Sequence, residues 1–282
     1  MNVAEAMTPR SSVVTVEIPG SRDDALEYLQ NREFSSVPVV KPTDDGEEYR
    51  GIVTRESLIE RPDEDQLALL MDDEIPTVAP DASITDAASL MFTEEERRLP
   101  VVDDSFEGII TVTDVVRSIA EGEVGDDTPV GDIATREIMT THTDTPIGAA
   151  ERQLFYANVP YAIVLDDSGG MAGIVTSVDI LRTAEIVEGS ESTGNSFADQ
   201  DNEWMWEGIK GVGSRTLPTR NVELPSIAVD ELMTDDVITI ATNKSIQDAA
   251  QTMITHDIEQ IPLVSGDKLV GIVRDIDLLR AL

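Results

Sequence analysis

The chain has 282 residues, 40% of them hydrophobic, and a formal net charge of −36 at pH 7. This length is enough for about two domains with buried cores, and the negative charge disfavours binding to nucleic acid or to anionic membranes. There are no cysteines, which excludes disulfides, thiolate metal sites and cysteine nucleophiles. The two histidines, His142 and His256, are too few for a histidine-based metal site, so no metal is expected.

The chain is expected to be cytoplasmic. Its longest apolar stretch, near residues 159–165, is far shorter than the ~20 residues that span a bilayer. The N-terminal residues Met-Asn-Val-Ala-Glu-Ala-Met have neither the basic start nor the apolar core of a signal peptide.

The charge also predicts a halophilic protein. Self-repulsion at this net charge is tolerable when salt screens it, and at molar salt the Debye length falls to ~3 Å. We therefore expect the melting temperature to rise between low salt and molar potassium chloride. The alternative is an acidic protein from a mesophile, and equal melting temperatures in the two conditions would favour it.

Taken in order, the chain contains one pattern four times. Each copy begins with a short strand, expected at residues 13–16, 77–78, 140–141 and 237–240. A helix follows, with alanine and aliphatic residues at helical spacing, as at residues 84–91 and 246–253. A proline then opens a buried strand, at residues 37–40, 99–102, 159–164 and 261–264. A last strand starts at Gly51, Gly108, Gly173 or Gly271 and runs into a helix, so the predicted order is β-α-β-β-α.

The point where this last strand meets its helix, called the joint below, contains polar residues with a possible role in capping or ligand binding. The second copy reads Gly-Ile-Ile-Thr-Val-Thr-Asp and the third reads Gly-Ile-Val-Thr-Ser-Val-Asp. A Thr-x-x-Asp sequence before an apolar run is typical of a capping box, in which the acid accepts a backbone N–H of the cap. The alternative is a ligand site, because a helix N-terminus favours phosphate and a carboxylate can accept both hydroxyls of a ribose.

Together, the aliphatic-Pro strand, the turn and the Gly-aliphatic-aliphatic-Thr-x-x-Asp joint resemble the cystathionine-β-synthase-type regulatory domain, or CBS domain. The fold class is thus expected to be α/β (α+β), with four repeats of the archaeal, haloarchaeal type forming two tandem Bateman modules. The repeats are expected at residues 1–62, 63–124, 125–187 and 226–282, with the first paired with the second and the third with the fourth. The sequence leaves open whether the two modules close within one chain or pair across a homodimer.

The resemblance implies adenosyl ligands, such as AMP, ADP, ATP or S-adenosylmethionine, between paired repeats. The family's Thr contacts phosphate, its Asp holds the ribose, and the base lies against the first strand. Carried over, these roles fall on Thr111, Asp114, Thr77, Val78, Ala79 and Leu99 in the second repeat, and on Thr176, Asp179, Thr140, Thr141, His142 and Val159 in the third.

The other two joints are incomplete. The first repeat keeps Thr54, which is a candidate ligand contact, but has Ser57 in place of the acid, so this site ranks last of the four. The fourth keeps Asp277 but has Arg274, which either binds phosphate bidentately or fills the site itself. Four arginines are candidates to reach phosphates from the same or a neighbouring repeat, with ordinary surface charges as the alternative: Arg97, Arg98, Arg117 and Arg182.

Residues 188–225 depart from the pattern. An acidic linker is expected first, followed by a segment that contains both tryptophans, Trp204 and Trp206. This segment is interpreted as an arm packed on a module surface, with a partner-docking or ligand-gating arm as the alternative.

The sequence predicts a non-catalytic sensor that binds an adenosyl ligand and passes its state to an unknown protein partner. One alternative is a structural adaptor with vestigial ligand sites. An enzyme related to inosine-monophosphate dehydrogenase is disfavoured, because the chain has no cysteine and no length left for a barrel domain.

Overall fold

The structure, a computed structural model, describes residues 1–29, 36–44, 46–54, 57–58, 61, 64–125, 127–183, 185–188, 220–266 and 268–282. It divides into two compact units: Met1–Arg136 with Thr239–Leu282, and Glu137–Ile238. The first unit holds the sheets of the first, second and fourth repeats, and the second unit holds the sheet of the third. No helix in these described ranges is both long and apolar enough to cross a membrane.

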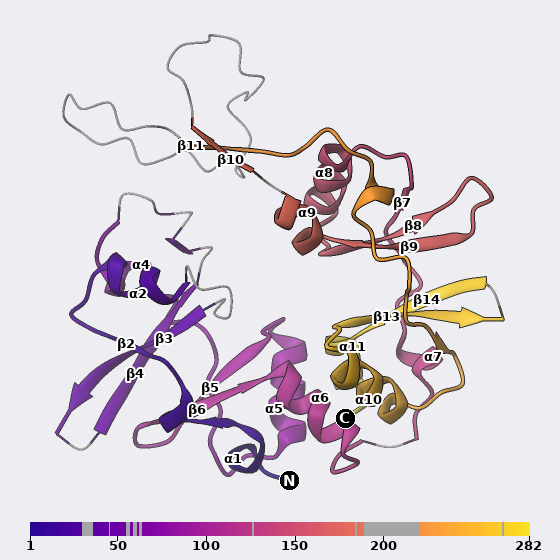
Figure 1. Cartoon of the computed structure of the whole chain (residues 1–282). Helices are drawn as coiled ribbons and strands as arrows, with labels where there is room; N and C mark the ends of the chain where they lie inside the picture. Colours follow the sequence, from indigo (N-terminus) through magenta and orange to yellow (C-terminus); the bar gives the residue numbers. More distant parts are fainter. Residues whose placement is uncertain are drawn as a thin grey trace. The chain divides into compact units, whose positions relative to one another are not determined.

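The first two repeats build two three-stranded sheets (Figure 1). The elements of the first are α1 (Val3–Ala6), β1 (Thr8–Pro9), η1 (Arg10–Ser12), β2 (Val16–Glu17), α2 (Arg22–Leu29), β3 (Ser36–Thr43) and β4 (Gly46–Thr54). Those of the second are α4 (Leu67–Leu70), α5 (Ile84–Thr93), β5 (Arg98–Val102), β6 (Phe106–Thr111) and α6 (Val112–Ala120). β2, β3 and β4 follow one another in the first sheet, whereas β1 joins the second sheet beside β6.

The third and fourth repeats have the same order of elements. The third comprises α7 (Val130–Ile133), β7 (Thr140–His142), α8 (Ile147–Ala157), β8 (Tyr161–Leu165), β9 (Met171–Thr176) and α9 (Ser177–Thr183). The fourth comprises η2 (Val229–Glu231), β12 (Ile240–Ala241), α10 (Ile246–His256), β13 (Gln260–Ser265), β14 (Lys268–Arg274), α11 (Asp275–Leu278) and η3 (Leu279–Ala281). The predicted β-α-β-β-α class is confirmed.

The first strand is shorter than predicted in three repeats, whereas β7 of the third runs one residue past the predicted end, to His142. β2 starts at Val16 rather than at residue 13, β12 covers Ile240–Ala241, and Val78 forms an isolated parallel bridge to Val101. The reason is that this strand pairs along one edge only, with two or three residues of the central strand.

The proline of the second strand does not open that strand in three of the four repeats. Pro100 is the third residue of β5, and its carbonyl accepts the Val78 N–H at 3.0 Å. The nitrogen of Pro100 faces the same edge, just before the position where the parallel neighbour begins. A missing N–H there breaks no ladder hydrogen bond, which is why the strand tolerates the proline.

The segment before each first strand, here called the lead segment, packs on the paired repeat rather than on its own. The lead segment of the first repeat bridges the second repeat at Ser83 and Ile109, and that of the second bridges the first at Ser21 and Ile52. The third and fourth repeats exchange lead segments in the same way, through the bridges Pro129–Ser245, Thr135–Ile272, Ala228–Pro146 and Thr234–Ile174. These exchanges follow the predicted pairing of first with second and third with fourth.

The exchange explains the glycine that starts each Gly-aliphatic-aliphatic run. A Cβ on Gly108 would lie 2.3 Å from the Thr8 carbonyl oxygen of the lead segment. The equivalent Cβ positions on the other three glycines also meet lead-segment backbone oxygens, at 2.5 to 3.1 Å: Gly51, Gly173 and Gly271. Only a residue without Cβ lets the lead segment lie this close.

The second and fourth repeats also share one hydrophobic core in the first unit. α6 packs against α10 (Figure 1). α5 packs against η3, so the first helix of each repeat contacts the last helix of the other. Gln247 and Gln251 of α10 both donate to the Ala120 carbonyl at the end of α6. The first and third repeats have separate, smaller cores.

Residues 188–225 were predicted as a linker and insert from Glu188 onward. Instead β10 (Glu185–Glu188) pairs antiparallel with β11 (Arg220–Glu223), so the two ends of this stretch lie side by side. Ile186 is paired with Val222 in this register. Trp204 and Trp206 lie outside the described residues.

A ring and ion-pair contact joins the first repeat to the second. The Arg10 guanidinium pairs with Glu47 of β4 and lies 5.9 Å from the ring centroid of Phe106 of β6. Tyr49 of β4 stacks on Phe106 with 5.8 Å between ring centroids. Burial raises the pKa of the Tyr49 phenol, and the charges of Asp72, Glu96 and Asp73 add to this.

This contact predicts a pH dependence. The hydrogen bond from Arg10 lowers the pKa of Glu47 below its ordinary value of 4.5, although partial burial opposes the shift. A carboxyl whose pKa is lower in the folded state stabilises the fold above about pH 4.5 and loses that effect as the pH falls through the folded-state pKa. We expect Glu47→Gln to melt below wild type at pH 7 and the gap to close in acid.

The matched control is Glu48→Gln on the same strand. Glu48 pairs with Arg50 on the exposed side, at 3.0 Å, and exposed pairs stabilise little. Thermal melts of both variants between pH 7 and pH 3 make the comparison. A gap between wild type and Glu47→Gln that is independent of pH would contradict the prediction.

Candidate functional site

The joint of the second repeat lies where β6 ends and α6 begins, with Thr111 as the N-cap. Asp114 Oδ2 accepts the Thr111 backbone N–H at 2.9 Å and the Thr111 hydroxyl at 2.7 Å. The Thr111 Oγ1 in turn accepts the Asp114 N–H at 3.4 Å. A capping box is therefore present, and the hydroxyl proton is committed to the carboxylate. A phosphate contact from the Thr111 hydroxyl would require this hydrogen bond to open.

The other carboxylate oxygen of Asp114 takes no part in the cap. Oδ1 accepts one hydrogen bond, from Arg117 Nη1 at 3.1 Å, and the Arg117 side chain is half exposed. The Asp114 residue itself is only 8% exposed. An ionised carboxylate has about four lone-pair acceptor sites, so Oδ1 has capacity for further donors.

Of the residues predicted to lie near a base, Leu99 lies beside the joint, whereas Val78 pairs further along β5, at Val101. Arg98 pairs with Thr111 and Leu99 with Ile110 across β5 and β6, while Val78 bridges the other edge of β5. The side chains of Val78 and Leu99 are buried in the core. A ligand here would therefore meet their backbone together with the exposed residues Thr77 and Ala79.

The third repeat has the same joint between β9 and α9. Asp179 Oδ2 accepts the Thr176 N–H at 3.0 Å and the Thr176 hydroxyl at 2.7 Å. Asp179 Oδ1 lies 3.7 Å from Arg182 Nη1, and the Asp179 side chain is 20% exposed against 10% for Asp114. Its outward oxygen is therefore the more accessible of the two.

The base-side residues of the third repeat lie on and after β7. Thr140 is exposed, while Thr141 is buried and its hydroxyl has no hydrogen-bond partner among the described residues. Val159 packs against the core of the third repeat.

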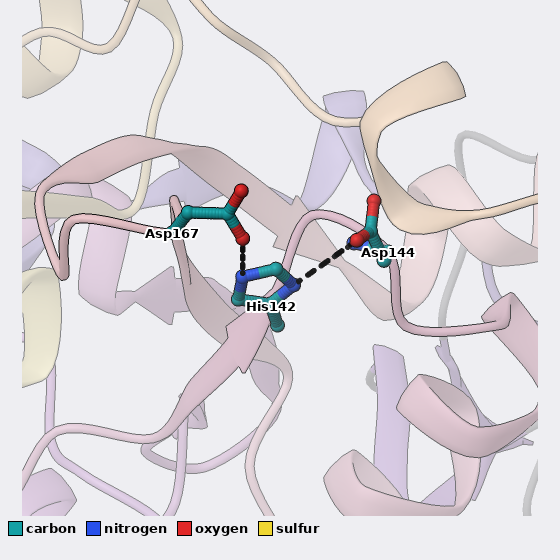
Figure 2. Close-up of side chains that lie close together, drawn as sticks. All are labelled: His142, Asp144 and Asp167. Atoms are coloured by element: carbon teal, nitrogen blue, oxygen red, sulfur yellow. Dashed lines mark hydrogen bonds and ion pairs between the residues drawn. The ribbon is translucent and has the colours of Figure 1, made fainter.

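His142 lies between two acids, as Figure 2 shows. Its Nε2 is 3.2 Å from Asp167 Oδ1, and its Nδ1 accepts the Asp144 backbone N–H at 3.2 Å. This fits the neutral tautomer with the proton on Nε2. The three side chains could converge on a cation, since their ligand atoms lie within 4.8 Å of one another. Asp144 and Asp167 are 85% and 97% exposed, however, and exposed acidic groups of this kind are common without a bound ion.

The two incomplete joints differ in how they are filled. In the first repeat the Ser57 Oγ accepts the Thr54 N–H at 3.1 Å and donates to the Thr54 carbonyl at 3.0 Å, so a neutral cap replaces the charged one. In the fourth, Arg274 binds both oxygens of Asp277, through Nε at 3.1 Å and Nη2 at 2.8 Å. Because Asp277 is 2% exposed, this arginine occupies the acceptor that a ribose would need.

Two of the phosphate candidates are paired with other repeats. Arg97 binds Asp275 and Glu259 of the fourth repeat, at 2.6 Å and 3.3 Å from its Nη2. Arg98 Nη1 donates to the Ser36 hydroxyl of the first repeat. To reach a phosphate, either arginine would have to leave these partners.

Burial and neighbouring charges shift the pKa values of these side chains. Burial lowers the pKa of Arg97, but its hydrogen bond to Asp275 and the charges of Asp275 and Glu259 raise it overall. Burial lowers the pKa of Arg98, and the charge of Arg97 adds to this while Glu96 opposes it. Burial raises the pKa of Glu96 itself.

The sequence interpretation missed Asp275. It is 5% exposed and receives both terminal nitrogens of Arg97. Aligning the joints gives a signal that could have found it, because Asp275 stands where the second repeat has Val112 and the third has Ser177. An acid at the first position of a helix in an otherwise apolar setting suggests a charged partner.

Known proteins have the same fold and similar sequences. The protein MJ1404 of Methanocaldococcus jannaschii is 29% identical over 280 residues, which are 99% of this chain and 61% of that protein. The chain thus spans about three fifths of the length of that relative. A crystal structure of a conserved protein from Pyrococcus horikoshii is 26% identical, with a TM-score of 0.69 and 99% of both chains covered. The structure of MJ1225 from M. jannaschii, at 19% identity and a TM-score of 0.65, shows the fold alone.

A family model for the CBS domain matches four stretches, residues 3–64, 66–121, 130–185 and 229–282. These stretches take in the three-stranded sheet and the joint of each repeat. The chain therefore belongs to the CBS domain family, with four CBS domains in one chain.

Proposed function

We propose that this protein is a non-catalytic sensor that binds adenosyl ligands at the joints of its second and third repeats. The ligand class is AMP, ADP, ATP or S-adenosylmethionine, and a protein partner reads the bound state. Asp114 and Asp179 accept the ribose hydroxyls, and Arg117 and Arg182 face the phosphates or the substituent in their place.

The observation that supports this proposal is that the two oxygens of each carboxylate have different partners. Oδ2 of Asp114 and Asp179 serves the helix cap, whereas Oδ1 is turned to the arginine of the next helical turn. A carboxylate that only capped the helix would need one oxygen. The second oxygen, beside an exposed arginine and the N-terminus of a helix, suits a polar ligand with an anionic tail.

The incomplete joints support two ligands rather than four. Ser57 has no carboxylate oxygen to offer, and both oxygens of Asp277 are taken by Arg274. The proposal therefore assigns ligands to the second and third repeats and none to the first and fourth.

Signalling to the partner requires that the ligand prefer one of two states of the protein, since coupling cannot exceed that preference. The structural adaptor remains the competing function, with vestigial joints that only cap their helices.

Calorimetry separates the two. The full chain in molar potassium chloride is titrated with AMP, ATP and S-adenosylmethionine, and mass spectrometry identifies any ligand that co-purifies. We expect saturable binding of at least one compound at about two equivalents per chain. If none of the three binds and no ligand co-purifies, the sensor function is wrong and the adaptor is favoured.

A further inference from the structure

The short helix α11 begins with two buried acids that have different partners. Asp277 is bound by Arg274 within its own repeat, through two hydrogen bonds. Asp275 is bound by Arg97 of the second repeat, which lies 178 positions away in the sequence. Both acids of the fourth joint are therefore bound by arginines, and the arginine that binds Asp275 belongs to another repeat.

The contact between Arg97 and Asp275 is bidentate. Nη1 lies 3.2 Å from Oδ1 and Nη2 lies 2.6 Å from Oδ2, while Glu259 Oε1 approaches Nη2 at 3.3 Å. Asp275 Oδ1 also accepts the Ile276 N–H at 2.7 Å. Such fork-to-fork pairs fix the direction as well as the distance of the arginine.

The backbone of Arg97 supports the second joint directly. Its carbonyl accepts the N–H of Val112, the first residue of α6, at 3.0 Å. Val112 follows Thr111 and lies two residues before Asp114. The fourth repeat repeats this arrangement, since the Glu259 carbonyl accepts the Asp275 N–H at 2.8 Å. The ion pair thus ties the start of α11 to the strand edge on which α6 begins.

From this geometry we infer that Arg97 and Asp275 are a positioning pair, through which the fourth repeat holds the second repeat's joint in its binding conformation. This role goes beyond the proposed function, and its effect on affinity rests on that function. It also makes Arg97 a residue that acts through the joint, in contrast to a residue that contacts the ligand's phosphate.

The ligand-free test is hydrogen exchange at the Val112 amide. In Asp275→Asn the bidentate charge pair is lost. We expect the Val112 amide to exchange about tenfold faster, because the segment that carries its acceptor, the Arg97 carbonyl, opens more often. The Ser177 amide, which makes the corresponding bond to the Pro160 carbonyl at 2.9 Å in the third repeat, is the internal reference and should not change. Arg280→Gln is the matched control, since Arg280 contacts Phe92 across the same two repeats but away from the joint.

The ligand test compares adenosine with AMP. A positioning residue acts on the whole joint, so Arg97→Gln and Asp275→Asn should each weaken both compounds about tenfold at one site. The double variant should weaken them no further, because both changes break one contact. Arg97→Lys keeps the charge but not the fork, so its affinity for both compounds should lie between that of these variants and that of wild type. It replaces them in the test if they fail to fold.

Three results would overturn the inference. Unchanged Val112 exchange in Asp275→Asn means that the pair does not hold the joint. A loss of AMP affinity with unchanged adenosine affinity in Arg97→Gln makes Arg97 a phosphate ligand. Faster Val112 exchange with unchanged affinity for both compounds would mean that the pair only packs the two repeats together and has no effect on ligand binding. If wild type binds no adenosyl compound, the proposed function fails, while the exchange experiment still decides whether the pair positions the joint.

Discussion

Replacing Asp114 and Asp179 together by asparagine should weaken adenosyl-ligand binding by about 100-fold at each site. An asparagine can keep the cap, because its Oδ1 accepts the Thr111 or Thr176 donors that Oδ2 accepts now. Its Nδ2 then replaces the outward oxygen, so an acceptor for the ribose becomes a donor. Two charge-assisted hydrogen bonds at about 1.5 kcal/mol each account for the expected factor.

Asparagine is chosen because alanine would also remove the cap, which costs about 1 kcal/mol. Calorimetry of the double variant and of each single variant gives the affinity at each joint, and melting temperatures close to wild type show that the caps remain. Ser57→Ala in the first repeat is the matched control and should leave binding unchanged. Wild-type affinity in the double variant would show that these carboxylates only cap their helices.

Gly108→Ala should give the largest loss of stability among single substitutions at the repeated motif. A Cβ at Gly108 would lie 2.3 Å from the Thr8 carbonyl and 3.2 Å from Met7 Sδ, and the first of these atoms is backbone that cannot rotate away. The lead segment of the first repeat would have to leave the second repeat's sheet. Overpacking of this kind costs about 3 kcal/mol, and we expect the melting temperature to fall by several degrees.

The control for this prediction is Gly148→Ala in α8. A Cβ there meets nothing within 4 Å, and Gly148 lies in the first turn of α8. Alanine is the better helix former, by at most about 0.5–1 kcal/mol. The two changes add the same methyl group, so they should shift the melting temperature in opposite directions. A Gly108→Ala variant as stable as wild type would mean that the lead segment is dispensable to the fold.

Much of the candidate site could be predicted from the sequence because its parts are local. Thr111 and Asp114 lie three residues apart, and any helix that starts at Val112 brings their side chains together. The same holds for Thr176 with Asp179, and for Arg274 with Asp277. The interpretation that Arg274 fills its own site also follows from spacing alone, although only the structure shows that it takes both oxygens of Asp277.

The arginines were harder to predict because their partners are distant in the chain. Arg97 and Arg98 are neighbours in the sequence, yet one reaches Asp275 of the fourth repeat and the other reaches Ser36 of the first. Arg97 lies just before β5 and Arg98 is the first residue of β5, and successive residues of an extended chain point to opposite faces. Nothing in the local pattern states which repeat covers each face.

The sequence by itself determined the four local units, the order of strands and helices in each, and the capped joints, because periodicity and capping act within a few residues. Only the tertiary structure decided which lead segment covers which glycine, that the second and fourth repeats share a core, and that Asp275 binds Arg97. These features depend on contacts between residues that are from tens to well over a hundred positions apart. Four similar repeats offer similar surfaces, so the choice among them is made by the packing of the folded chain.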